Sequence, residues 1–166
     1  MANTHRVLVE FLEHQAVDLA AEDQALLDSA QAAASRAYAP YSRFHVGASL
    51  RTTDGGVVSG NNQENASFPA GICAERTALH AAMAARPDAV VDVMAIVVPT
   101  GDPMRPVTPC GICRQALVEQ EQRQGRSMRL LMCVPGGPVW EVARAGDLLP
   151  LSFDASFLLP LGPEAP

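Results

Sequence analysis

Hydrophobic and polar positions along the first third of the chain predict a helix followed by a β-hairpin. Small and apolar residues recur at three- and four-residue spacing over 23–37, which predicts a helix with Asp23 as its N-cap. Apolar residues alternate with polar or small ones over 45–52, as in a half-buried strand. The turn sequence over 54–56 then predicts a hairpin to a second strand over 57–60.

Continuous apolar runs later in the chain predict further strands. Residues 93–98 form a run of strand length that we expect to be buried on both faces, and residues 129–134 form another. A short strand is predicted over 139–142 and a short edge strand over 6–13. These runs therefore add three or more strands to the hairpin.

Two more helices are predicted between these strands. The first, over 73–85, has alanines along its packing side, and the second covers 111–123. The resulting order β-β-α-β-α-β predicts a three-layer α/β/α domain of the α/β class. We expect residues 1–166 to form this single domain, with an N-terminal extension over 1–20 and a flexible, proline-rich tail over 158–166.

Composition narrows the possible partners. The chain has 166 residues, 48% of them hydrophobic, which is enough for one core. Its formal net charge of −6 disfavours a nucleic-acid partner, because an acidic surface repels phosphates. The modest cluster of Arg123, Arg126 and Arg129 is predicted to be solvated surface. No apolar run is long enough for a membrane span and no signal peptide is evident, so we expect a cytoplasmic protein without a membrane partner.

The cysteines suggest a metal centre. Cys73, Cys110 and Cys113 each lie at a predicted helix start, where the helix dipole favours a thiolate. Three thiolates form an incomplete tetrahedral zinc site, and a catalytic zinc needs its fourth position for water. The remaining thiol, Cys133, lies within an apolar strand and is predicted to be a small core residue.

The residues after Cys73 provide the matching acid–base chemistry. Glu75 lies two positions later, so it can reach a zinc-bound water without being a ligand, and we predict that it is the general base. Three thiolates and one Zn²⁺ sum to −3 + 2 = −1. Arg76 is expected to offset this charge by donating hydrogen bonds to thiolate sulfur. Deaminases of nucleobases use this combination of zinc, thiolates and a non-ligand glutamate.

Each part of this pattern also has an alternative interpretation. The Cys110–Cys113 pair alone resembles a redox dithiol, and with other cysteines it is compatible with a structural zinc site. Glu75 alone is compatible with a charge that interacts with the helix dipole. The polar segment over 61–70 is either a surface loop or, given its place before Cys73, a substrate-binding loop.

From about residue 37 to 153 the chain resembles the small, homotetrameric class of cytidine deaminases, which hold zinc with three cysteines. Five blocks in the same order carry the resemblance: residues 40–48 (PYSRFHVGA), 60–69 (GNNQENASFP), 71–78 (GICAERTA), 109–115 (PCGICRQ) and 148–153 (LLPLSF). The resemblance implies a central five-stranded mixed sheet and one Zn²⁺ per subunit, held by Cys73, Cys110 and Cys113. It also implies hydrolysis of cytidine and 2′-deoxycytidine to uridine and 2′-deoxyuridine with release of ammonia, as in pyrimidine salvage.

The same resemblance implies roles for individual residues. Asn62 and Glu64 are expected to contact the ribose 3′-hydroxyl, and Phe44 to pack against the pyrimidine ring. The Ala74 backbone N–H and the Glu75 side chain are expected to bind the base edge. Phe153 is expected to enter a neighbouring subunit's site, so that the subunits of a homotetramer would share their active sites.

Some positions depart from the commonest family pattern. Asn61 and Gln63 stand where a cysteine and an aliphatic residue are frequent, and Phe68 stands where tyrosine is frequent. A related deaminase acting on a modified cytosine nucleoside, or on an antibiotic such as blasticidin S, is the alternative within this chemistry. A thiol oxidoreductase and a non-catalytic zinc-stabilised interaction module are the alternatives outside it.

Overall fold

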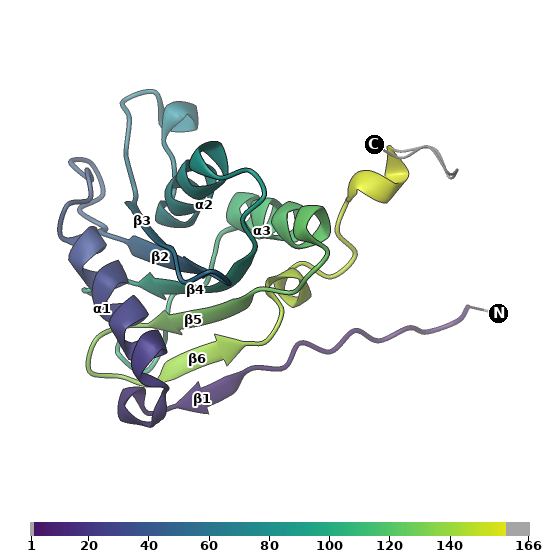
Figure 1. The fold of residues 1–166 in the computed structure, drawn as a ribbon, viewed down its shortest axis with the longest axis horizontal. Coiled ribbons are helices and arrows are strands. Elements are labelled where there is room, and N and C mark those ends of the chain that lie inside the picture. The colour runs from purple at the N-terminus through teal and green to yellow at the C-terminus, as the bar shows by residue number, and fades with distance from the viewer. Residues whose placement is uncertain (1, 159–166) are drawn as a thin grey trace.

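The computed structural model describes residues 2–158 and has a six-stranded sheet between helices (Figure 1). Apart from Leu158, the tail predicted over 158–166 lies outside the described residues. In chain order the elements are β1 (Leu12–His14), η1 (Ala16–Asp18), α1 (Ala21–Ala34), β2 (Gly47–Thr52), β3 (Val57–Asn61), η2 (Phe68–Ala70), α2 (Ala74–Ala85), β4 (Val91–Val97), α3 (Gly111–Gln124), β5 (Arg129–Cys133), β6 (Val139–Val142), η3 (Ala145–Leu148) and η4 (Ala155–Phe157).

The sheet is mixed and has one strand more than expected. Its order is β1-β6-β5-β4-β2-β3, in which β4 and β5 run parallel and the other neighbours run antiparallel. The expectation of five strands is wrong because β1 adds an edge strand to β6, with His14 opposite Val139. The edge strand predicted over 6–13 forms only from Leu12, which pairs with Glu141 near the end of the short strand β6.

Alternating side chains of β4 divide the apolar core into two parts. Val93, Ala95 and Val97 pack with α1, whereas Met94 and Ile96 pack on the face covered by α2 and α3 (Figure 1). This alternation follows from the two-residue period of a strand. The predicted three layers and the burial of this run on both faces are confirmed.

The strand predicted over 45–52 begins later and is buried more completely than expected. β2 starts at Gly47, where an added Cβ would lie 1.9 Å from the Ala30 carbonyl oxygen of α1. Helices cover both faces of β2, so the half-buried interpretation was wrong. The one polar side chain at its centre, Ser49, is fully buried and shares a hydrogen bond of 2.6 Å with Ser59. Pairing the two hydroxyls removes the cost of burying them singly.

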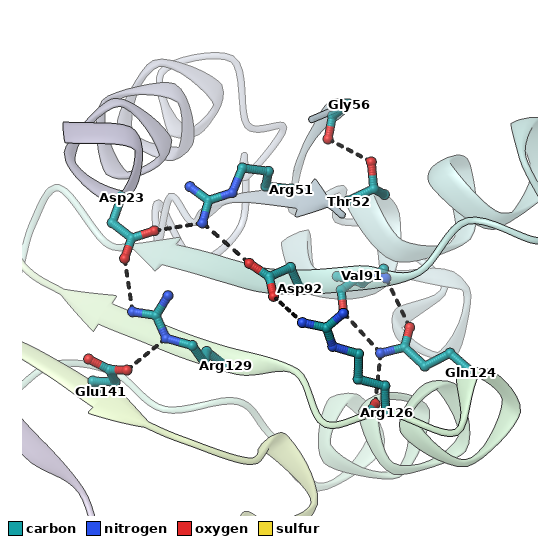
Figure 2. A network of polar contacts seen from close by, with 10 residues as sticks. All are labelled: Asp23, Arg51, Thr52, Gly56, Val91, Asp92, Gln124, Arg126, Arg129 and Glu141. Atoms are coloured by element: carbon teal, nitrogen blue, oxygen red, sulfur yellow. Dashed lines mark hydrogen bonds and ion pairs between the residues drawn. The ribbon is translucent and has the colours of Figure 1, made fainter. Parts of the chain in front are cut away.

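Asp23 does not cap α1 as predicted. The helix begins at Ala21, and the Asp23 side chain is buried against the sheet (Figure 2). Its oxygens lie 3.0 Å from an Arg51 nitrogen and 2.8 Å from an Arg129 nitrogen. Arg129 also donates to Glu141 at 2.8 Å. These contacts tie α1 to β2, β5 and β6.

The arginine cluster predicted to be solvated surface is therefore partly structural. The Arg129 side chain is only 33% exposed and lies between two carboxylates (Figure 2). Arg126 lies 3.4 Å from Asp92, and Arg123 donates to the Pro87 carbonyl at 2.8 Å. No helix within residues 2–158 combines the length and apolar character needed to cross a bilayer.

The buried carboxylate generates a stability prediction. Asp23→Ala leaves Arg51 and Arg129 without their shared partner, so we expect the free energy of unfolding to fall by about 2–3 kcal/mol. Urea unfolding at fixed zinc and protein concentrations measures the change. The control is Asp28→Ala, an exposed position on the same helix. Equal stabilities of the two variants would contradict a structural role for Asp23.

Candidate metal centre and active site

The three predicted ligands meet because two helices begin at the same place. Cys73 immediately precedes α2, Cys110 immediately precedes α3, and Cys113 lies in the first turn of α3. Both helices pack on the same face of the sheet. Helix α2 lies very close to β3, since a Cβ added to Gly60 would be 2.4 Å from the Ala78 backbone nitrogen. The alanines on its packing side permit this approach.

The thiol geometry fits a zinc ion. The Cys73 and Cys110 sulfurs are 3.8 Å apart, the Cys110 and Cys113 sulfurs are 3.6 Å apart, and all three lie within 4.8 Å of one another. A tetrahedral site with Zn–S bonds of about 2.3 Å requires sulfurs about 3.8 Å apart. The residues therefore fit one Zn²⁺ per subunit, with a fourth position left for a non-protein ligand.

The electrostatic setting favours a thiolate at this cluster. A hydrogen bond from Cys113 lowers the pKa of Cys73 to about 5, and hydrogen bonds from Cys110 and Arg76 act in the same direction. The contact with Cys73 raises the pKa of Cys113 in the metal-free cluster, because neighbouring thiols share protons. By contrast, burial raises the pKa of Cys133 to about 11. Its predicted place in the core, away from the cluster, is confirmed.

Glu75 is a buried carboxyl next to this cluster. It occupies the first turn of α2, and the residue is only 5% exposed. Burial raises the pKa of the Glu75 carboxyl, and the nearby Cys73 adds to the rise. The preceding residue, Ala74, is fully buried at the first helical position. Its N–H has no acceptor within the helix and is free to bind another group.

Arg114 supports the cluster in a way that the sequence analysis missed. Its guanidinium donates to the Pro109 carbonyl at 2.7 Å, to the Leu148 carbonyl at 2.9 Å and to the Thr108 hydroxyl at 3.1 Å. These bonds hold the irregular chain that leads into Cys110. Arg114 lies within the block 109–115 that resembles the deaminases, but nothing in the local pattern distinguishes it from a surface arginine.

A cavity of about 590 Å³ opens beside Cys73, and its lining does not include Cys110, Cys113 or Glu75. Its lining contains Cys73, Arg76, Asn62 and Glu64, four of the residues singled out from the sequence. The remaining lining residues come from the loop over 41–46, the polar segment over 61–70 and the chain around the starts of α2 and α3. They are Tyr41, Ser42, Gln63, Asn65, Phe68, Gly71, Ile72 and Ile112. The segment over 61–70 is thus part of a cavity wall rather than a plain surface loop.

Glu64 binds the preceding loop through both carboxylate oxygens. It accepts hydrogen bonds from the Tyr41 backbone at 2.8 Å, from the Ser42 backbone at 3.3 Å and from the Ser42 hydroxyl. The bond from the Ser42 hydroxyl is the main reason that the pKa of Glu64 lies below its usual range. Ser42 also accepts a hydrogen bond of 3.0 Å from the Phe44 backbone. Nothing in the sequence around Ser42 indicates this role.

Asn62 binds the next part of the same loop. Its amide oxygen accepts from the Val46 backbone and its amide nitrogen donates to the Phe44 carbonyl, each at 2.8 Å. Arg43, between Ser42 and Phe44, has a left-handed φ of 58°. The two polar side chains together hold this bend, which places Phe44 at the edge of the cavity-forming loop. The Phe44 ring itself does not belong to the cavity lining.

The structure places Phe153 away from the cavity of its own chain. Gln115 donates to its carbonyl at 2.8 Å, and its ring stacks on Phe157 with centroids 5.5 Å apart. The ring is more than half exposed.

Known proteins are similar to this chain in sequence and in fold. Residues 20–125 match the family model described as the cytidine and deoxycytidylate deaminase zinc-binding region. A cytidine deaminase of Halalkalibacterium halodurans is 50% identical over 96 residues, which cover 58% of this chain and 70% of that protein. One from Mycobacterium tuberculosis is 40% identical over 131 residues, which cover 77% and 86% of the two chains.

A solved structure extends the similarity to three dimensions. The crystal structure of cytidine deaminase from Burkholderia pseudomallei matches with a TM-score of 0.68 and 44% identity, over 78% of this chain and 97% of the other. With the family model covering both cysteine segments, the chain belongs to the cytidine and deoxycytidylate deaminase family.

Proposed function

We propose that this protein is a zinc-dependent enzyme that hydrolyses cytidine and 2′-deoxycytidine to uridine and 2′-deoxyuridine with release of ammonia. One observation carries the proposal: three sulfurs with zinc-site spacing lie beside a buried glutamate, and one of the three cysteines, Cys73, lines a cavity large enough for a nucleoside. Relatives that are 40–50% identical are named cytidine deaminases, which supports the same substrate class here.

The chemistry requires a nucleophile and a proton carrier. Cys73, Cys110 and Cys113 would hold the zinc, which would supply a water of lowered pKa as the nucleophile. Glu75 then acts as the general base that accepts the water proton. Burial raises the pKa of the Glu75 carboxyl, which suits a group that first accepts a proton and then donates it. Arg76 contributes positive charge beside the thiolates.

The proton balance assigns Glu75 two transfers. It takes a proton from water as the C4–O bond forms and gives it to ring nitrogen N3. It then takes the remaining proton from the new C4 hydroxyl and gives it to the amino group, so that the C4–N bond breaks, the C4=O bond forms and ammonia leaves. The Ala74 N–H and the Glu75 side chain bind the base edge during these steps. Cytidine and water thus become uridine and ammonia.

The loop over 41–46 and the polar segment after β3 form the sugar side of the site. Asn62 and Glu64 bind the ribose 3′-hydroxyl, and Phe44 packs against the pyrimidine. Each Asn62 amide atom makes one hydrogen bond to the backbone, which leaves one N–H and one lone pair for a ligand. The same contacts preorganise the loop before substrate binds.

We further propose a homotetramer whose active sites are shared. Large apolar side chains around the cavity remain exposed in one chain, including Tyr41, Phe68 and Ile112. Phe153 is also exposed and lies outside the lining of its own cavity. Exposed apolar groups of this size are typical of subunit interfaces. Phe153 of one subunit would then close a neighbour's cavity.

The cellular setting follows from the thiols. A cluster of sulfurs 3.6–3.8 Å apart needs a reducing compartment, since oxidation would remove the zinc ligands. We therefore place the enzyme in the cytoplasm, where recovery of free nucleosides in pyrimidine salvage supplies its substrates. Its partners are small-molecule nucleosides, and its net charge of −6 disfavours nucleic acid.

Replacing the proposed base tests the mechanism. In Glu75→Gln we expect the turnover number for cytidine to fall by about 10²–10⁴-fold, because the amide cannot accept the water proton. Zinc content should remain at one per chain. The matched control is Glu22→Gln, another glutamate in the first turn of a helix, which should keep full activity. An active, zinc-loaded Glu75→Gln enzyme would rule out this role.

The loop contact generates a pH prediction. The Ser42 hydroxyl lowers the pKa of Glu64. The stability that the ionised Glu64 contributes is therefore fully present above the unfolded-state pKa and is lost as the pH falls through the lower folded value. Ser42→Ala should raise the pKa of Glu64 toward its ordinary value. A carbon-13 NMR titration of the carboxyl measures the midpoint. The control is Ser35→Ala, at an exposed serine elsewhere, which should leave the titration midpoint of Glu64 unchanged. An unshifted midpoint in Ser42→Ala would show that the Ser42 hydroxyl does not lower the pKa of Glu64.

Subunit mixing tests the shared site. Phe153→Ala should lower kcat/KM by roughly tenfold, the effect of losing one well-packed aromatic contact. Coexpression of Phe153→Ala and Glu75→Gln chains should restore activity, because some sites then combine Glu75 and Phe153 from different chains. Activity no greater than the sum of the two separate variants would show that each site is completed within one chain.

A further inference from the structure

The N-terminal arm, residues 2–11, is an exposed apolar segment that the enzyme's chemistry does not use. It extends from the start of β1 away from the body of the molecule (Figure 1). Leu8 is 82% exposed, and Val7, Val9 and Phe11 are between 42% and 59% exposed. One contact of the arm joins the rings of Phe11 and Trp140, with centroids 4.7 Å apart.

This arm continues an open sheet edge. Among the described residues, β1 pairs with β6 on one side and with no strand on the other. An extended apolar segment in line with an edge strand presents unpaired backbone groups and readily accepts another strand.

The arm sequence is complementary to itself. In Arg6-Val7-Leu8-Val9-Glu10, an antiparallel pair centred on Leu8 places Arg6 opposite Glu10 of the second copy. The two-fold axis repeats this ion pair, places Val7 opposite Val9, and sets the two Leu8 side chains against each other. We propose that the arms of two copies of this chain pair in this register and join the two sheets across their β1 edges.

The same register also fills the free edge of β1. In a pair centred on Leu8, the residue numbers of any two opposite positions add up to 16. Residues 2–4 of one copy therefore lie opposite residues 12–14 of the other copy, which form β1. In an extended strand, Val7, Val9 and Phe11 lie on the same face. Val7 and Val9 thus extend the apolar surface that Phe11 forms with Trp140. Apolar surface that is exposed in one copy thus becomes covered in the pair.

Neighbouring registers lack this complementarity. Centring the pair on Val9 places Arg6 opposite Leu12, and centring it on Glu10 places the two Glu10 carboxylates opposite each other. Like charges directly opposite destabilise an antiparallel pair. Charge therefore selects the register centred on Leu8.

The absence of lysine from the chain gives a direct test. The twelve Lys and Arg residues are all arginines. Arg6→Lys introduces the sole lysine, and a zero-length carbodiimide joins its amine to a carboxylate in contact with it. Within one extended arm, positions 6 and 10 are about 13 Å apart, so a link from the introduced amine to Glu10 has to join two chains. We expect covalent dimers to form. When nitrogen-14 and nitrogen-15 chains are mixed, some of the cross-linked peptides that join position 6 to Glu10 should contain one peptide of each label.

Two controls make the result specific. The native chain, which has no lysine, and Arg6→Lys/Glu10→Gln should both lack the linked peptide. The proposed pairing would be overturned if the introduced amine linked only to carboxylates of its own chain. It would also be overturned if the amine linked to carboxylates other than Glu10 in both lysine variants.

Charge exchange provides an independent measurement. Arg6→Glu should weaken the arm-dependent association by about tenfold, because it sets carboxylates opposite each other twice. Arg6→Glu/Glu10→Arg should restore it. Sedimentation of both variants is compared with a chain lacking residues 2–11, which reports any association that does not use the arm. Identical association of the single and double variants would overturn the proposal, and deaminase activity does not enter this comparison.

Discussion

The convergence of two helix N-termini on one face of the sheet is the constraint on which the site depends. Neither cysteine segment makes a metal centre alone. The close packing of α2 on β3 at Gly60 and the bonds of Arg114 bring sulfurs from residues 73 and 110 to 3.8 Å. The same geometry directs the partial positive charge of both helices toward the thiolates. A shift of either helix would enlarge the sulfur spacing beyond what zinc accepts.

Much of this arrangement could be predicted from the sequence because its signals are local. Helix periodicity, the apolar run that became β4 and the spacing of Cys110 and Cys113 all depend on neighbouring residues. The zinc ligands and the burial of Cys133 followed from the same reasoning, and the sulfur geometry supports the ligand set. The chain's membership of the deaminase family agrees with the resemblance carried by its five blocks.

The failures involve partners that are distant in the sequence. Asp23 is of a residue type that often caps helices, but in the structure it forms ion pairs with Arg51 and Arg129. These arginines come close to Asp23 only when the sheet has folded. The sixth strand depends on a short pairing between residues near opposite ends of the chain. The half-buried prediction for β2 failed because alternation along a strand does not reveal that helices cover both faces. Ser42 and Arg114 were missed because each has a partner on a distant segment, Glu64 for Ser42 and the Leu148 carbonyl for Arg114.

The loop over 41–46 is held in place by two side chains that also line the cavity, Asn62 and Glu64. Glu64 and Asn62 organise the loop over 41–46 before any substrate is present. Their contacts reduce the conformational entropy lost on binding and keep polar groups directed toward the cavity. The loop over 41–46 is therefore preorganised, because its backbone geometry depends on the Glu64 and Asn62 side chains of a distant segment.

The most direct test of this account is to measure ammonia release from cytidine as zinc is added to metal-depleted protein. Zinc content is determined in the same samples. The account predicts that turnover rises in proportion to bound zinc, reaches its maximum at one zinc per chain and disappears on chelation. Full zinc occupancy without release of ammonia from cytidine or 2′-deoxycytidine would contradict it. A metal-free protein that instead forms a reversible Cys110–Cys113 disulfide would assign the thiols to redox chemistry.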